Sequence, residues 1–258
     1  MRKTIRRIDL NADCGEGFGA YALGDDAALL RSVTSANIAC GFHAGDPGTM
    51  TRTVTLAAGS GVALGAHPGL PDLVGFGRRR MNVTAAEVRD LVTYQIGAMA
   101  GFAARQGQTL RHVKPHGALY WMAEEDPKTA EAIAQAVLDW DAAVVLVGLS
   151  GGGLVQAGLA RGLQTASEIF ADRAYMPNGT LAPRSLPNAV LHDLDEVAAR
   201  ITLWAREGTL TATDGTALRV GADTICIHSD SPSAPALAAR VRQALEAAEY
   251  TVQPVGAL

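Results

Sequence analysis

The sequence has few of the features that mark secreted, membrane or nucleic-acid-binding proteins. Its three cysteines, Cys14, Cys40 and Cys226, form no CxxC pair, and no apolar run of signal-peptide length opens the chain. No stretch approaches the roughly 18 uncharged apolar residues of a membrane span. The net charge is −4, and Arg78–Arg80 is the longest basic run. We therefore expect a cytoplasmic protein with reduced thiols that binds neither nucleic acid nor membranes.

Common catalytic motifs are missing as well. There is no GxxxxGK[ST], no HExxH and no GxSxG. Residues 15–20 formally match GxGxxA, but polar residues separate them from the preceding apolar run, which disfavours a dinucleotide site. Residues 150–153, SGGG, could hold a phosphate or carboxylate on their free N–H groups, or could simply be a loop.

What the sequence does contain is a regular alternation of strand and helix patterns. With 48% hydrophobic and 19% charged residues, the chain can form a sizeable core. Short runs rich in Val, Ile and Leu predict buried parallel strands at 5–10, 36–40, 62–66, 110–114, 143–148, 165–170 and 223–228. Helical spacing predicts helices at 47–58, 84–105, 127–138, 154–161, 194–207 and 234–248, and Asp214-Gly215 predicts a hairpin within 210–220. Seven strand–helix units favour a single α/β barrel domain over residues 1–258, with a doubly wound open sheet as the alternative.

Polar residues follow each predicted strand. Four of the six histidines, His43, His67, His116 and His228, come at the ends of four different strands. In a parallel barrel, all of these ends open on the face that carries active sites. His112, inside a predicted strand, and His192, on a predicted surface loop, are expected to be structural.

The strand ends offer chemistry of two kinds. Asp13, His43 and His67, with His116 as a further candidate, could hold Zn²⁺ or a similar ion. The same groups could instead act as general bases on water. Four cationic side chains are candidates for binding an anion, namely Lys114, Arg78, Arg79 and Arg173.

Five multi-residue motifs resemble the LamB/YcsF family. They are DLNADCGEGFG (9–19), NIACGFHAGDP (37–47), GAHPGLPDLVGFGRR (65–79), VKPHGALY (113–120) and FADRAYMPNGTLAPR (170–184). The resemblance implies an irregular (β/α)7 barrel of the glycoside hydrolase/deacetylase type. It also implies a hydrolase that, with partner subunits B and C and ATP as cosubstrate, opens the lactam 5-oxoproline to L-glutamate. A homo-oligomer is a further possibility.

The resemblance also suggests roles for individual residues. The implied catalytic set is Asp13, His43, His67, Lys114 and His116. The implied substrate-binding set is Asn11, Glu16, Arg79, Glu168, Arg173 and His228. A divalent metal, if bound, would be held by Asp13, His43 and His67. Two positions depart from the family pattern, since Ser229 stands where glycine is usual and Trp121 where asparagine is frequent.

Two other functions stay open at this point. A stand-alone, metal-dependent deacetylase of an acetylated sugar would use the same Asp and His set, although 5% aromatic residues are few for a sugar groove. A non-catalytic subunit that binds ligand or scaffolds its partners would need those residues for affinity but not for turnover.

Overall fold

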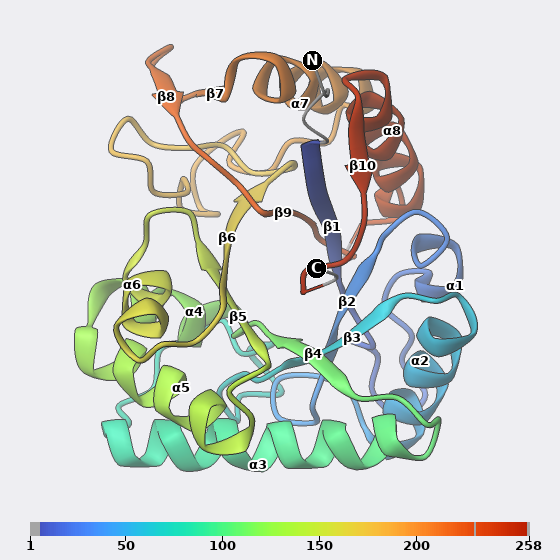
Figure 1. Ribbon diagram of the computed structural model, residues 1–258, viewed down its shortest axis with the longest axis vertical. Helices are drawn as coiled ribbons and strands as arrows, with labels where there is room; N and C mark the ends of the chain where they lie inside the picture. Colours follow the sequence, from blue (N-terminus) through green and yellow to red (C-terminus); the bar gives the residue numbers. More distant parts are fainter. Residues whose placement is uncertain (1–5, 230, 257–258) are drawn as a thin grey trace, which may run out of the picture.

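Seven parallel strands close into a barrel, which confirms the fold class expected from the sequence. The computed structural model describes residues 6–229 and 231–256. Strands follow one another around the barrel and the last pairs again with the first. Figure 1 shows the ring, formed by β1 (Arg6–Cys14), β2 (Ser35–Ala39), β3 (Ala63–His67), β4 (Leu110–Val113), β5 (Val145–Leu149), β6 (Thr165–Phe170) and β9 (Thr224–Ile227).

Helices surround the barrel on the outside (Figure 1). They are α1 (Asp26–Leu29), α2 (Pro47–Gly59), α3 (Ala85–Ala104), α4 (Gly117–Glu125), α5 (Pro127–Trp140), α6 (Gly153–Ala160), α7 (Leu194–Glu207) and α8 (Ala234–Ala247). Asp46 caps α2 by accepting hydrogen bonds from the N–H groups of Gly48 and Thr49, and Thr84 forms a capping box with Glu87 at α3. Within the described ranges, no helix has the length and apolar character needed to cross a bilayer.

Some local expectations need correction. Strand β1 does not end near residue 10 but runs to Cys14, so Asn11 and Asp13 lie within the strand. Helices α1 and α4 and strand β10 (Tyr250–Val252) were not expected from the sequence. The hairpin at Asp214-Gly215 is present as β7 (Thr209–Thr211) and β8 (Ala217–Arg219). The predicted start of the first strand at Ile5, and Asp230, lie outside the described residues.

The interior of the barrel is polar on most of its strands, which explains why β1 was misread. Alternate residues of a strand face opposite sides. On β1, Ile8, Leu10 and Ala12 belong to the main hydrophobic core, while Asp9, Asn11 and Asp13 are buried and hydrogen-bonded across the barrel. The sequence of such a strand alternates between apolar and polar residues, as it would in a strand with one face in solvent, although both faces are buried.

A small apolar cluster lies in the amino-terminal halves of β5 and β6. Val145 and Val147 of β5, Ala166 of β6 and Val255 from the segment after β10 form this cluster, separate from the main core. Strand β10 guides the segment there by pairing with Arg6–Ile8 of β1. The segment after β10 therefore packs against the amino-terminal halves of β5 and β6.

Candidate functional site

A hydrogen-bonded layer of amides crosses the middle of the barrel. Asn37 Nδ2 donates to Asn11 Oδ1 at 2.7 Å and to Asp13 Oδ1 at 2.8 Å. His112 lies 2.7 Å from Asn37 Oδ1 through its Nε2, which must therefore carry the hydrogen. Burial, with Lys114 nearby, lowers the pKa of His112 to about 3, so the imidazole is neutral. This arrangement fits the structural role expected for His112.

A buried ion-pair network lies directly above that layer. Lys114 follows β4 and is only 2% exposed, and its Nζ is 2.8 Å from Glu168 Oε1 and 3.1 Å from Asp13 Oδ1. It also donates to Cys226 Sγ at 3.0 Å. Burial opposes its charge, but Asp13, Cys226 and Glu168 outweigh burial and raise the pKa of Lys114 well above its ordinary value.

Asp13 is held as a carboxylate in this network. Burial by itself would raise the pKa of Asp13, but His67 and Lys114 outweigh it and hold the pKa well below its ordinary value. Its Oδ1 accepts hydrogen bonds from Asn37 and Lys114, and its Oδ2 lies 3.4 Å from His67 Nε2. Asp13 thus links the ion pair to the histidines above it.

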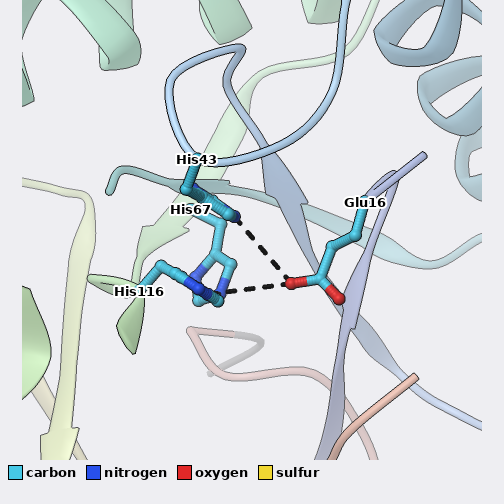
Figure 2. A group of neighbouring side chains, drawn as sticks. All are labelled: Glu16, His43, His67 and His116. Atoms are coloured by element: carbon cyan, nitrogen blue, oxygen red, sulfur yellow. Dashed lines mark hydrogen bonds and ion pairs between the residues drawn. The ribbon is translucent and has the colours of Figure 1, made fainter. Parts of the chain in front are cut away.

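Three imidazoles and a carboxylate gather at the carboxyl end of the barrel (Figure 2). His43 follows β2, His67 ends β3, and His116 precedes α4, so three strand–helix connections deliver them to one place. His43 and His116 stack with ring centroids 3.7 Å apart, and His67 stands nearly perpendicular to both. Glu16 faces them, with Oε1 3.8 Å from His43 Nε2 and 3.7 Å from His116 Nδ1. All four residues are buried.

The segment after β3 covers these rings. Phe76 lies edge-on to both His43 and His116, and Gly77 sits against them with φ +63°. A Cβ at Gly77 would come within 2.6 Å of the His43 Cβ, so a larger residue would displace the ring. The site is therefore screened from bulk water by residues of its own chain.

The remaining residues singled out from the sequence lie at different places. His228 Nδ1 is 2.9 Å from Asp172 Oδ2, and the His228 ring stacks on Phe170. Arg173 is buried and donates to the carbonyl oxygens of Ala189 and Ala182. Asn11, Glu16 and Glu168 belong to the networks described above.

Arg79 differs from the other candidate residues because its side chain is largely exposed to solvent. Its side chain is 65% exposed and forms an ion pair with Asp72. The adjacent Arg78 places its guanidinium 4.8 Å from the Phe76 ring centroid, directly over the cover of the site. The substrate roles of Arg79, Arg173 and His228 stay predictions.

Four contributors were not identified from the sequence. Asn37, Cys226 and Tyr120 complete the interior network, the last through a 3.2 Å hydrogen bond to Glu168 Oε2. Ser229, noted only as a departure from the family pattern, donates to Glu16 Oε2 at 3.2 Å. Ser229 adopts no positive φ, so the glycine that is usual there is not required by the backbone of this chain.

The four residues of Figure 2 are a suitable set for a divalent metal. One ligand atom from each of Glu16, His43, His67 and His116 lies within 4.8 Å of the others. Imidazole nitrogens and carboxylate oxygens are the ligands of Zn²⁺ and related ions. The set overlaps the sequence-based set of Asp13, His43 and His67 but has Glu16 and His116 where Asp13 was expected.

A closed parallel barrel with carboxylates and histidines at its carboxyl end defines the class, an α/β barrel with an enzyme-like site. The chain belongs to the LamB/YcsF family, whose model matches residues 8–258. It is 54% identical over 246 residues to a Bordetella pertussis protein named as the A subunit of 5-oxoprolinase, covering 95% of this chain and 98% of the relative.

Solved structures agree with this assignment. The crystal structure of the lactam utilization protein from Thermus thermophilus matches with a TM-score of 0.90 at 48% identity, covering 96% of this chain and 99% of that one. A family 4 carbohydrate esterase from Streptomyces lividans matches with a TM-score of 0.51 at 12% identity, covering 97% and 93%. The second likeness concerns the fold alone and confirms the deacetylase-type barrel.

Proposed function

We propose that this chain is the A subunit of an ATP-dependent 5-oxoprolinase, which opens 5-oxo-L-proline to L-glutamate together with subunits B and C. The main support is the likeness over nearly the whole chain to relatives that carry this name, at 54% identity for the Bordetella pertussis protein. The buried carboxylates and histidines supply groups suited to a hydrolysis. The relatives are named as one subunit of an enzyme, which is the reason for invoking partner chains.

The chemistry explains why ATP would be needed. Amide resonance makes the lactam carbonyl carbon a poor electrophile towards water. Transfer of the ATP γ-phosphoryl group to the lactam oxygen gives ADP and an activated imidate. Water adds to the ring carbon, the C–N bond breaks with its electrons on nitrogen, and γ-glutamyl phosphate results. A second water then releases phosphate and leaves L-glutamate. Because this chain has no Walker motif, we assign ATP binding and the phosphoryl transfer to the partner subunits.

Within this scheme the histidines act on water. A neutral imidazole accepts a proton at neutral pH, and burial lowers the pKa values of His43 and His116 well below the ordinary histidine value. Asp13, kept ionised by its neighbours, has its Oδ2 3.4 Å from His67 Nε2 and stabilises positive charge that develops there, rather than taking a proton itself. If the same nitrogens instead hold a divalent ion, they are ligands and not bases, and the ion would supply a Lewis acid and a more acidic bound water.

Lys114 has a positioning role in this proposal. Its ammonium group carries three N–H donors, and the surrounding acceptors already include Asn11, Asp13 and Cys226 as well as the paired Glu168. It therefore fixes the orientation of Asp13, in place of the direct contact with a developing oxyanion suggested by the sequence. Of the two arginine candidates for the substrate carboxylate, we favour Arg173, because it is buried whereas the side chain of Arg79 is 65% exposed.

Burial of the site fits an ATP-coupled reaction. Bulk water would hydrolyse an activated intermediate unproductively, so excluding it preserves the coupling. The three cysteines are buried free thiols, in keeping with the cytoplasmic location that we propose.

Reconstitution tests the proposal directly. The chain mixed with its B and C partners is expected to release L-glutamate and phosphate from 5-oxoproline and ATP, and each chain alone is not. His43→Ala should abolish turnover while assembly with the partners and the circular dichroism spectrum stay unchanged. His192→Ala, at an exposed loop position, is the matched control and should retain activity. Wild-type turnover by the His43→Ala complex would refute the assigned role.

One observation keeps a deacetylase as the second candidate. Glu16 with three imidazoles resembles the donor set of a hydrolytic metal site. This candidate predicts acetate release from an acetylated sugar by the chain alone, without ATP. In the third possibility, a non-catalytic subunit, His43→Ala and Asp13→Asn would weaken ligand binding yet leave turnover of the complex unchanged.

A further inference from the structure

We propose that Glu16, His43, His67 and His116 form a binding site for one divalent transition-metal ion, with Glu16 and not Asp13 as the carboxylate ligand. Glu16, His43 and His116 come from the connections after β1, β2 and β4, and His67 is the last residue of β3, so the pairing of four neighbouring strands brings them together. Each is at most 6% exposed. The inference concerns binding and stands whether or not the chain acts on 5-oxoproline.

The first argument comes from the hydrogens on two of the rings. His67 Nδ1 lies 2.7 Å from the Lys114 carbonyl oxygen, and His116 Nε2 lies 2.8 Å from the Phe76 carbonyl oxygen. A carbonyl oxygen can only accept, so both of these nitrogens carry hydrogen. In the neutral rings, His67 Nε2 and His116 Nδ1 therefore present lone pairs, and these two atoms are 3.0 Å apart. The Asp13 carboxylate oxygen Oδ2 also lies 3.4 Å from His67 Nε2. Two facing lone pairs beside a carboxylate require a positive centre between or beside them.

A shared proton would satisfy that pair but not His43. Neither His43 nitrogen has a hydrogen-bond partner in the described part of the chain, although the side chain is fully buried. An unsatisfied buried polar atom is costly. A metal ion can bind all three imidazoles once one of the two stacked rings turns, whereas one proton between His67 and His116 leaves His43 unsatisfied. The orphaned nitrogens of His43 therefore favour a metal over a proton.

The surroundings of the ligands are those of a metal site. Ligating histidines usually donate their second N–H to a backbone carbonyl or a carboxylate, which fixes the tautomer and the ring orientation. His67 and His116 both do so. Ser229 Oγ donates to Glu16 Oε2, so the other oxygen, Oε1, is the one turned towards the rings.

The distances suit an ion with bonds to nitrogen of about 2.0–2.1 Å. Two such bonds at a tetrahedral angle place their nitrogens about 3.3 Å from each other, a few tenths of an ångström more than the 3.0 Å between His67 and His116. His43 lies flat against His116, so its Nε2 reaches the same ion only when one ring turns out of the stack. Three imidazoles and one carboxylate select Zn²⁺, Co²⁺ or a similar ion over Mg²⁺ and Ca²⁺, which prefer oxygen ligands.

A second group of possible ligands is excluded by charge. Asp13, Cys226 and His228 also bring ligand atoms close together. However, the Lys114 ammonium lies 3.1 Å from Asp13 Oδ1 and 3.0 Å from Cys226 Sγ. A cation placed there would face the lysine charge at short range. The same ammonium neutralises Asp13 and makes it the poorer ligand for the histidine site.

Metal binding to the purified full-length chain is the test. After removal of metal by chelation and dialysis, we expect calorimetric titration with Zn²⁺ to give one equivalent bound and a higher melting temperature. Co²⁺ should give visible d–d absorption bands. Glu16→Gln and His116→Gln should each weaken Zn²⁺ binding about 100-fold or more, and Ser229→Ala about 10-fold through the loss of its hydrogen bond to Glu16.

Two controls make the result decisive. His192→Ala removes an exposed histidine and should bind as the wild type does, while circular dichroism confirms that every variant is folded. Asp13→Asn distinguishes the proposed ligand set from the sequence-based set that contains Asp13. Because Asp13 is not a ligand in the proposed set, this variant should still bind one equivalent of Zn²⁺. The proposal fails if the wild type binds no stoichiometric metal. It fails equally if Asp13→Asn loses the metal while His116→Gln retains it. None of these readouts depends on oxoprolinase activity.

Discussion

Lys114 Nζ lies 2.8 Å from Glu168 Oε1 inside the barrel, where neither side chain is more than 2% exposed. Removal of one partner from such a pair leaves a buried charge without compensation. We expect Lys114→Met to lower the free energy of unfolding by about 3–5 kcal/mol, measured by urea denaturation. Lys128→Met, at an exposed position near the start of α5, should change it by less than about 0.5 kcal/mol. A Lys114→Met protein as stable as the wild type would show that the network is not an ion pair.

Asp9 should give the fold a measurable pH dependence. Burial raises the pKa of Asp9 from 3.8 to about 6, although Thr224, Thr34 and Ser35 donate hydrogen bonds to it. A carboxyl whose pKa is higher in the folded state favours folding below its unfolded pKa, and that contribution is lost as the pH rises through about 6. The difference of about two pKa units corresponds to about 3 kcal/mol.

The isosteric Asp9→Asn variant isolates this contribution. Its amide does not titrate, so the stability of the wild type relative to Asp9→Asn should fall by about 2 kcal/mol between pH 4 and pH 7. Urea denaturation at several pH values measures the difference. Other carboxylates with lowered pKa values, such as Asp172, affect both proteins equally and cancel. A difference that does not vary with pH would contradict the prediction.

Gly65 should tolerate no side chain. A Cβ there would lie 2.1 Å from His112 Nε2, inside the packed interior of the barrel. We expect Gly65→Ala to cost about 1–3 kcal/mol by overpacking and to disturb the hydrogen bond between His112 and Asn37. Gly101→Ala on α3, with no atom within 4 Å of its added Cβ, should instead be neutral or stabilising by up to about 1 kcal/mol. Equal stability of the two variants would contradict the prediction.

The rim of the site should contact the partner subunits, if the proposed function is correct. Val74 is 91% exposed and Tyr21 83% exposed, and Phe18, Leu23, Leu73 and Met81 are further exposed apolar residues of the same two loops, which follow β1 and β3. We expect Val74→Asp to weaken assembly with the partners at least 10-fold, measured by calorimetry, without changing stability. Leu159→Asp near the end of α6 is the control at another exposed leucine. Unchanged assembly of Val74→Asp would remove this loop from the interface.

The fold was largely predictable from the sequence because strand and helix periods alternate clearly. Strand β6 and helix α7 have the predicted bounds, and the ends of most other elements differ by one or two residues. The exceptions have local causes. Asn11 and Asp13 read as a loop because their polar side chains point into the barrel. Helix α4 was hidden because Pro115 and Gly117 at its start are typical of turns.

The composition of the site was only partly predictable. The four strand-end histidines were identified, and three of them meet at one point, but His228 pairs with Asp172 instead. The roles of Cys226 and Ser229 depend on contacts with Lys114 and Glu16 across the closed barrel. Contacts of this kind are set by barrel closure between residues far apart in the chain, and no local pattern reveals them.

The packing of Val255 against Val145, Val147 and Ala166 has a consequence for the end of the chain. The segment after β10 buries aliphatic side chains of β5 and β6, two strands that lie far from it in the sequence. Removal of this segment would expose those side chains to water and lower the stability of the barrel.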